Sequence, residues 1–364
     1  MHIVVDKNIL MYYINLKVKR LTISNMSATI KDVAKLAKVS VATVSLVIHN
    51  NKRISPETRK RVLKAIKELN YHPTRLARGL VSKKSGNIGF ILTEDHFSRT
   101  EPFYTQIFLG TEFKAREEEY YILLTTVSSN FNEKDSLPRF VLEKNVDGVI
   151  LAGKVPLLLI NGLKKYNLPI VFVDYYPPNG DFPAVLIDNL SGGFKATNHL
   201  IECKHTRIGF VAGDIQHPSI KERFQGYRMA LENAGIPFDP RLTITDEPYP
   251  ARENGYRAAK KLLSQAPDVT AIFTCNDAMA IGVLRYLKET SRQVPKDISL
   301  IGFDDVEADL SLDPPLTTMR VPKVELGIEA INLMMEILKK GSMPARKILV
   351  PVELVVRRST CDLA

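Results

Sequence analysis

The sequence reads ATIKDVAKLAKVSVATVSLVIHN at residues 28–50 and ISPETRKRVLKAIKELNYHPTRLARGL at residues 54–80, and these two runs decide the N-terminal fold. Helix start signals occur at Thr29 with Asp32, at Ser40, and at Ser55 before Pro56. The residues that follow each start are apolar at helical spacing: Ile30, Val33, Ala34 and Ala37, then Val44, Val47 and Ile48, then Val62, Ala65, Ile66 and Leu69. We therefore predict three short helices, with a tight break between the first two.

That break, at residues 38–40, is typical of a helix-turn-helix unit. In such units the second helix lies in the major groove of DNA, with its N-terminal side chains at the base edges. The spacing assigns these positions to Val41, Ala42 and Ser45. Many small helical bundles share this spacing, so the charge of the region must indicate whether the unit binds DNA.

The positive charge of the chain is concentrated in this region. The 364 residues include 50 Lys and Arg against 40 Asp and Glu, a net charge of +10. Residues 26–85 carry +11, residues 1–25 carry +3, and the remainder of the chain carries −4. A basic block on a mildly acidic body favours a nucleic-acid module joined to a second domain over a solvated basic surface.

The rest of the composition is ordinary for a globular protein, with 45% hydrophobic and 25% charged residues. No apolar run approaches the ~18 residues that cross a bilayer, so we expect no membrane segment. Cys203, Cys275 and Cys361 are far apart and form no CxxC pair, so we expect no disulfide framework, metal site or cofactor, and a cytoplasmic location. Residues 1–25 lack a targeting signal and are interpreted as an extension that is disordered or, if translation starts at Met26, not translated.

Beyond a polar linker at residues 82–86, strand-like and helix-like runs alternate. Continuous apolar runs are found at 87–92, 120–126, 146–153, 168–174, 184–188, 207–213, 242–246, 271–275 and 297–303. Amphipathic stretches lie between them, the first three at 103–119, 133–145 and 155–166. Buried strands that alternate with helices indicate parallel sheets in an α/β protein. About ten strands are many for one open sheet, so we predict two lobes with a ligand cleft between them.

Polar residues at the strand ends are the candidate ligand-binding groups, because open α/β sheets bind ligands outside the carboxyl ends of their strands. They are Asp174, Asn276, Asp277, Asp304 and Asp305, with Arg223 on a helix opened by Ser219. Each also has an ordinary structural interpretation. Asp277 could be a helix N-cap, Asp305 a loop former and Arg223 a surface charge.

The runs at 28–50 and 54–80 resemble the DNA-binding end of the lactose-repressor/galactose-repressor (LacI/GalR) family of transcriptional regulators. The resemblance implies that Thr29 and Ser40 hold the helices to phosphates and that Val41, Ala42 and Ser45 read bases. Residues 74–81 match the family's hinge helix, whose leucine, here Leu80, wedges into the minor groove. The implied DNA-binding residues are Thr29, Ser40, Val41, Ala42, Thr43, Ser45, His49, Tyr71, Ala77, Arg78 and Leu80.

Two positions depart from the family's pattern. Leu46 stands where an arginine that reaches a guanine is usual, and His49 stands where an asparagine is usual. A bidentate arginine–guanine contact is worth ~1–3 kcal/mol of base discrimination, so the usual operator sequence is not expected. The ordinary alternative for Leu46 is that it packs against the third helix.

The large domain resembles the family's effector domain, which has a periplasmic-binding-protein-like fold, in the runs EPFYTQIFLG, VLIDNLSGGFKATNHL, SIKERFQGYRMAL, CNDAMAIG, IGFDD and DPPLTT. The resemblance implies effector contacts at Phe103, Tyr104, Asp174, Arg223, Tyr249, Asn276 and Asp304, with Pro250 as the alternative to Tyr249. Carboxylates and an arginine suit the hydroxyls of a sugar, and the same set can bind a purine. We expect a sugar, with a purine as the alternative.

The expected fold is therefore an all-α helix-turn-helix domain followed by a two-lobed α/β effector domain. The helix-turn-helix domain spans 26–73, the hinge and linker 74–86, and the effector-binding and dimerisation domain 87–364. Lobe 1 comprises about 87–188 and 319–347, and lobe 2 about 189–318 and 348–360.

The expected function is a dimeric repressor that binds palindromic double-stranded operator DNA under the control of an effector. A phosphocarrier-protein corepressor is an alternative form of control. A solute-binding protein would share the two-lobed domain, but the basic helical unit and the missing secretory signal argue against it. An enzyme is not expected, because the sequence has no GxxxxGK[ST], GxGxxG, HExxH or GxSxG motif and no residue is assigned as catalytic. Tetrameric members of the family carry a leucine-heptad tail that this sequence lacks after Thr360, which favours a dimer.

Overall fold

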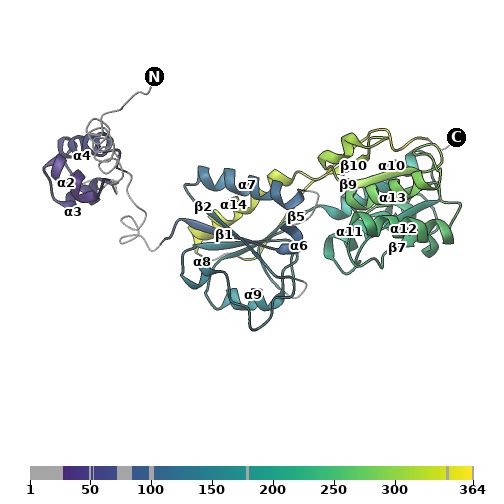
Figure 1. Cartoon of the computed structure of the whole chain (residues 1–364), viewed down its shortest axis with the longest axis horizontal. Coiled ribbons are helices and arrows are strands. Elements are labelled where there is room, and N and C mark those ends of the chain that lie inside the picture. The colour runs from purple at the N-terminus through teal and green to yellow at the C-terminus, as the bar shows by residue number, and fades with distance from the viewer. Residues whose placement is uncertain are drawn as a thin grey trace, which may run out of the picture. The chain divides into compact units, whose positions relative to one another are not determined.

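The computed structural model describes residues 28–48, 51, 53–71, 84–97, 102–177, 180–341 and 344–362. The chain divides into two units, residues 1–85 and residues 86–364 (Figure 1). The expected extension at 1–25, most of the expected hinge, and His49, Ala77, Arg78 and Leu80 lie outside the described residues. What we expect of them therefore stays a prediction.

The first unit contains the three predicted helices, α2 (Ile30–Ala37), α3 (Val41–Ile48) and α4 (Pro56–Glu68). Each begins directly after its predicted start signal. Their shared core consists of Val33, Ala34, Ala37, Val44, Val47, Val62, Ala65 and Tyr71, with Ile30, Ile48, Ile66 and Leu69 packed at its border. The apolar residues that recur at helical spacing are thus the ones that hold the helices together.

The second unit is built on two six-stranded sheets. In the first sheet, every neighbouring pair is parallel, and the order is β11 (Lys347–Val350), β5 (Ala184–Ile187), β4 (Ile170–Val173), β3 (Gly148–Ala152), β1 (Asn87–Thr93), β2 (Tyr121–Val127). In the second, the order is β12 (Glu353–Val355), β10 (Thr317–Arg320), β9 (Ser299–Asp304), β8 (Ala271–Thr274), β6 (Ile208–Val211), β7 (Thr243–Ile244), and only β12 is antiparallel to its neighbour. All nine predicted strands are present. The strands β10, β11 and β12 were not predicted, because β10 is rich in threonine and the other two are short and largely exposed.

Helices cover the sheets, and Figure 1 shows α7 and α14 on one face of the first sheet and α8 and α9 on the other. The bounds are α6 (Glu94–Phe97), α7 (Phe103–Glu117), α8 (Arg139–Leu142), α9 (Leu157–Lys164), α10 (Asn189–Glu202), α11 (Pro218–Asn233), α12 (Arg252–Gln265), α13 (Asp277–Glu289) and α14 (Lys323–Lys340), with 3₁₀ turns η1 (Pro240–Leu242) and η2 (Glu307–Ser311). The amphipathic stretch 133–145 is helical only in α8, because Pro138 disfavours helical backbone in the residue before it. Among the described residues, no helix has both the length and the apolar character of a bilayer span.

The chain passes from one sheet to the other after β5, after β10 and after β11. The last two passages therefore follow Arg320 and Val350. The expected lobe boundaries, at about 318/319 and 347/348, fall within β10 and β11, two or three residues before these passages. The polar Thr317 and Thr318 carry no apolar signal that would have revealed β10 in the sequence.

Candidate functional site

Side-chain caps hold the first turns of α2 and α3. Asp32 Oδ2 accepts hydrogen bonds from Thr29 N at 2.8 Å and from Thr29 Oγ1 at 2.7 Å, and these bonds lower the pKa of Asp32. Ser40 Oγ accepts from Thr43 N at 3.1 Å and lies 2.9 Å from Thr43 Oγ1. Thr29 and Ser40 are thus exposed residues at helix N-termini, where backbone N–H groups favour phosphate.

The side chains of α3 separate into a core face and a free face. Val44 and Val47 are buried among the three helices. Ala42 is exposed, and the exposed fractions of Val41 and Leu46 are 40% and 39%. Leu46 is therefore not part of the core that the three helices share, which counts against the alternative in which it packs against the third helix. The free face of α3 is unusually apolar for a surface helix.

Tyr71 lies in the core of the first unit, with an exposed fraction of 5%, and burial raises the pKa of its hydroxyl. The chain reverses at Asn70, whose φ of 46° is left-handed, and Tyr71 N donates to Ile66 O at 2.9 Å. This reversal turns the ring back onto the helices. Any contact of Tyr71 with DNA is therefore limited to the small part of the residue that stays exposed, and that contact stays a prediction.

The end of β4 gathers several of the predicted effector residues. Asp174 is buried, with a φ of 60°, and its Oδ2 accepts a hydrogen bond from Tyr104 Oη at 2.9 Å. The Tyr104 ring stacks on His96 with 4.7 Å between centroids, and Phe103 meets it edge-on at 5.1 Å. The structure thus brings Phe103, Tyr104 and Asp174 together as the resemblance implied, and it adds His96.

The N-terminal turn of α11 brings the second lobe to this strand end. Ser219 Oγ donates to Asp174 O at 3.5 Å, and the His217 ring lies 5.8 Å from that of Tyr175, between centroids. Arg223 follows Ser219 by one helical turn on the same face of α11. We call the group formed by Asp174, Arg223, Asn276 and Asp304, with their contacts, the interlobe site.

Arg223 is at the centre of the interlobe site and is only 6% exposed. Its Nε donates to Asn189 Oδ1 at 2.8 Å, and its Nη1 donates to Cys275 O. Nη1 also lies 3.8 Å from Asp304 Oδ1, and the guanidinium carbon lies 3.6 Å from the ring centroid of Phe303. The interpretation of Arg223 as a surface charge is therefore wrong.

The close packing of α10 on α11 explains how Asn189 reaches Arg223. A Cβ on Gly193 would collide with the carbonyl oxygen of Arg223, so glycine is needed for this approach of the two helices. Asn189 is the first residue of α10 and is itself buried. It directly follows the segment that contains β5, so the rule that assigns ligand groups to strand ends could have identified it.

Asn276, rather than Asp277, is the N-cap of α13. Asn276 Oδ1 accepts from Met279 N at 2.9 Å, and Nδ2 donates to Pro250 O at 2.9 Å. Asp277 is the first helical residue and is fully buried. Tyr249 is 65% exposed, so Pro250 is the member of this pair that contacts the interlobe site.

Asp304 ends β9 and Asp305 follows it, both in left-handed conformations, with φ of 122° and 55°. Asp305 accepts from Arg320 Nε at 2.6 Å and from Arg357 Nη2. Burial raises the pKa of Asp305, but the bonds from Arg357 and Arg320 outweigh this and leave it lowered. Asp305 is thus the loop former that its ordinary interpretation predicted, whereas Asp304 faces Arg223.

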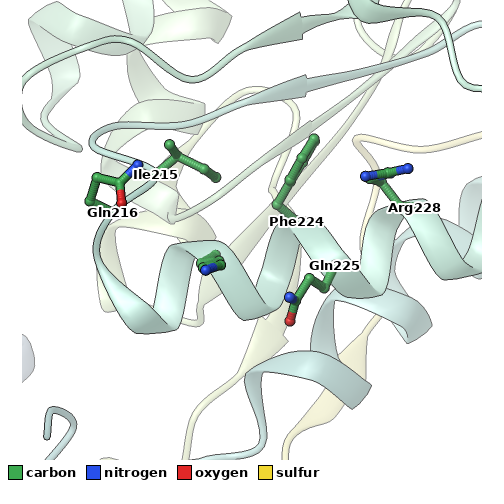
Figure 2. Close-up of a pocket in the computed structure, with 6 residues that line it drawn as sticks. Ile215, Gln216, Phe224, Gln225 and Arg228 are labelled. Atoms are coloured by element: carbon green, nitrogen blue, oxygen red, sulfur yellow. The ribbon is translucent and has the colours of Figure 1, made fainter. Parts of the chain in front are cut away.

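A separate hollow of about 230 Å³ lies beside α11, and Figure 2 shows five of its lining residues by name. It is lined by Ile215, Gln216, Lys221, Phe224, Gln225 and Arg228. None of the four residues that define the interlobe site lines it, so it is a distinct feature of the second lobe.

Comparison with known proteins identifies both units. Residues 29–74 match the family described as bacterial regulatory proteins, lacI family, and residues 197–360 match the periplasmic binding protein-like domain. The HTH-type transcriptional repressor PurR of Pasteurella multocida is 34% identical over 334 residues, which is 91% of this chain and 98% of the relative. PurR of Histophilus somni is also 34% identical, over 92% of this chain and all of the relative.

Solved structures agree with these relatives. A complex of the transcriptional regulator CelR with cellobiose is 31% identical, covers 91% of this chain and 99% of its own, and has a TM-score of 0.69. The lac repressor dimer bound to operator and the anti-inducer ONPF is 25% identical, covers 92% and 100%, and has a TM-score of 0.75. These relatives are repressors and regulators rather than enzymes, which confirms the expectation that the protein is not an enzyme. The chain therefore belongs to the lacI family of bacterial regulatory proteins, and it is a DNA-binding transcriptional repressor.

Proposed function

We propose that this repressor acts in the cytoplasm as a homodimer that binds a palindromic operator and is controlled by a small molecule bound at the interlobe site. The observation that carries the proposal is the buried cluster around Arg223 in the second lobe, one helical turn from Ser219, whose Oγ donates to Asp174 O at the end of β4 in the first lobe. The dimer and the palindrome are supported by the lac repressor relative, whose structure is a dimer bound to operator. A two-fold symmetric protein matches a two-fold symmetric site.

The DNA contacts divide into two chemical kinds. Thr29, Ser40 and Thr43 lie at helix N-termini and would contact phosphates, which fix orientation but carry no sequence information. Val41, Ala42 and Ser45 would face base edges, together with Leu46. His49, Ala77, Arg78 and Leu80 complete the proposed DNA surface and lie outside the described residues. Because the free face of α3 is apolar, we propose that thymine methyl groups contribute more to its readout than guanine acceptors do.

The chemistry of the interlobe site supports a sugar as the effector. Asp174 and Asp304 offer carboxylate acceptors, and the guanidinium of Arg223 offers donors in a fixed fork. Hydroxyl groups of a sugar both donate and accept hydrogen bonds, so they can pair with both kinds of group. Two solved relatives contain sugars, CelR in complex with cellobiose and a regulator from Enterococcus faecium with bound ribose. The latter is 27% identical, covers 76% of this chain and all of its own, and has a TM-score of 0.66.

A purine is the second candidate, and the aromatic side of the site favours it. Phe103, Tyr104 and His96 form a continuous aromatic group beside Asp174. Flat aromatic rings stack on one another in offset or edge-on arrangements, which suits a planar heterocycle. The relatives from Pasteurella multocida and Histophilus somni carry the name PurR.

Control would act through the three chain passages between the lobes. An effector that binds one arrangement of the lobes more tightly than the other shifts the population toward it. A difference of about 10⁴-fold in affinity would be needed to switch the repressor almost completely.

A thermal-shift screen followed by titration tests the proposal. The panel comprises cellobiose, ribose, adenine, guanine, hypoxanthine and the purine nucleosides, and a saturable rise in melting temperature identifies the class. Arg223→Gln should abolish the rise, whereas Arg228→Gln, on the exposed side of the same helix, should retain it. An Arg223→Gln protein that responds like the wild type would contradict an effector at the interlobe site.

A further inference from the structure

Two buried carboxyl groups lie next to the turn that carries Asp304. Asp277 begins α13 and Asp309 lies in η2, and both side chains have an exposed fraction of 0%. The backbone N–H of Val306 is shared between them, at 3.2 Å from Asp277 Oδ2 and 3.0 Å from Asp309 Oδ2. Thr318 Oγ1 donates to Asp277 Oδ1 at 2.6 Å.

The donors around the pair do not satisfy two ionised carboxylates. One N–H, that of Val306, donates to an oxygen of each carboxyl group, so the two groups lie side by side, and ionised carboxylates only accept hydrogen bonds. Asp309 Oδ1 is buried and receives no donor from the described parts of the chain. The packing is also tight, because a Cβ on Gly302 would collide with Asp277 Oδ1. A proton held between the two carboxyl groups resolves this shortage of donors.

The charged groups that face the pair do not neutralise it. Asp304 and Asp305 add negative charge from the end of β9. Arg357 is the cation whose charge lowers the pKa of Asp309. Arg357 is committed to Asp305 and to Leu316 O, the latter at 2.7 Å. Within the residues that the structure describes, neither Asp277 nor Asp309 forms an ion pair with a lysine or arginine, since Arg320 also binds Asp305 and Lys323 binds Asp304 O and Asp305 O.

We infer that Asp277 and Asp309 share one proton, and that this pair is a positioning device that holds the Asp304–Asp305–Val306 turn so that Asp304 can meet the effector. The turn needs external support, because Asp304 and Asp305 both have left-handed φ values that side chains disfavour. The N–H of Val306, the last residue of the turn, is the group that both carboxyls bind. The positioning role rests on the proposed function, whereas the shared proton does not.

The direction of the pH dependence follows from the burial of the pair. Burial and the neighbouring carboxylates raise the pKa of Asp277 well above its usual value, and burial raises the pKa of Asp309 to about 6. Both values lie above those of the unfolded chain. The stabilisation by the pair is therefore fully present below the pKa of unfolded aspartate and is lost as the pH rises through the raised pKa values, which are about 6 for Asp309 and well above the usual value for Asp277. Loss of the proton leaves two facing negative charges, which repel across the Val306 N–H.

Melting temperatures between about pH 5 and about pH 8 test the shared proton. The wild type should lose stability across this range. Asp309→Asn should fold and lack that loss, because its amide N–H replaces the proton as a donor to Asp277. Asp313→Asn, whose carboxyl is 97% exposed, is the matched control and should follow the wild type. If the melting temperature of Asp309→Asn falls with pH as steeply as that of the wild type, the two carboxyl groups do not share a proton.

A second variant and an infrared measurement test the shared proton even if Asp309→Asn does not fold. Asp277→Asn supplies the donor from the other side and should flatten the same slope. Burial also raises the pKa of Glu222, so the infrared experiment uses a Glu222→Gln protein, in which this carboxyl group cannot contribute to the spectrum. Its spectra should show the band of a protonated carboxylic acid at about pH 5, and the band should disappear toward about pH 8. If no such band is seen, the shared proton is refuted even if neither asparagine variant folds.

Calorimetric titration with the same sugars and purines at both pH values tests the positioning role. Wild-type affinity should fall as the pH rises, by about tenfold for each unit by which the effector raises the pKa of the pair. Asp309→Asn should keep its affinity. A pair that titrates while wild-type affinity stays constant would overturn the positioning role. If no panel member binds at any pH, the proposed function fails, and the melting and infrared data still decide the shared proton.

Discussion

Replacement of Arg223 by alanine removes the side chain that links Asp304 to Asn189 and to Cys275 O in the interlobe site. Three groups lose a partner: Asn189 Oδ1, Cys275 O and the Asp304 carboxylate. The packing of the guanidinium on the Phe303 ring is lost as well. Arg223→Ala should therefore act on stability and on effector binding together, and the two effects can be measured separately.

The structure sets the expected size of both effects. A buried acceptor that loses its donor costs about 1–3 kcal/mol, and breaking a buried charge pair costs about 3–5 kcal/mol. The two acceptors together cost about 2–6 kcal/mol, and the ion pair, at 3.8 Å, is too long to add its full value, so we expect the free energy of unfolding to fall by about 2–6 kcal/mol. A domain stability of about 5–15 kcal/mol can absorb this loss. A lost charge-assisted hydrogen bond to the effector costs about 1.5–3 kcal/mol, which is about a tenfold to 150-fold rise in Kd.

Urea unfolding, calorimetric titration with the effector and an operator-shift assay provide the three measurements. Arg228→Ala is the control, since its guanidinium is on the exposed side of α11 and stacks on Phe238 at 4.9 Å, a contact worth about 1 kcal/mol or less. Operator binding without effector should persist in both variants. The reasoning fails if Arg223→Ala is no less stable than Arg228→Ala, or if its Kd for the effector stays within about twofold of the wild type, a change of about 0.4 kcal/mol.

Three further predictions concern the DNA-binding unit. Leu46→Arg should create a preference for guanine at one position of each operator half-site, worth about 1–3 kcal/mol, and selection from random duplexes would show it; an unchanged consensus would mean that this position of α3 does not face bases. Tyr71→Ala should destabilise the three helices by about 3–5 kcal/mol and abolish operator binding, while the second unit still responds to the effector. Tyr71→Phe should retain the stability of the helices and operator binding. Circular dichroism measures the stability, and shift assays measure operator binding. Leu80→Ala should weaken specific binding but not salt-dependent non-specific binding, and equal operator affinity in filter-binding assays at several salt concentrations would count against a wedge at this residue.

Local signals in the sequence account for the success of the helix-turn-helix prediction. A helix start depends on residues three apart, as in Thr29 with Asp32 and Ser40 with Thr43, so the sequence contains the whole interaction. The same holds for the nine predicted strands, whose apolar runs are continuous. The short strands β10, β11 and β12 have no such local signal, because pairing with a distant strand, rather than their own composition, makes them strands.

The position of single side chains was predicted less well than the elements that carry them. Tyr71 matched the family's pattern, but the left-handed turn at Asn70 directs it into the core. Tyr249 is adjacent to the residue that contacts Asn276, so a difference of one position separates a surface ring from a member of the site. Such differences depend on the direction of the backbone at one residue, which spacing does not reveal.

The sequence by itself therefore determined the two-part organisation of this protein, the basic charge of its DNA-binding part, and the strand ends at which its candidate ligand groups lie. Only the tertiary structure decided which of these groups meet. Arg223 joins Asn189 to Cys275, and Val306 joins Asp277 to Asp309. The partners of Arg223 are separated by tens of residues along the chain. Capping and periodicity act within a few residues, whereas a buried hydrogen bond is set by how distant elements pack, and that packing exists only in the folded chain.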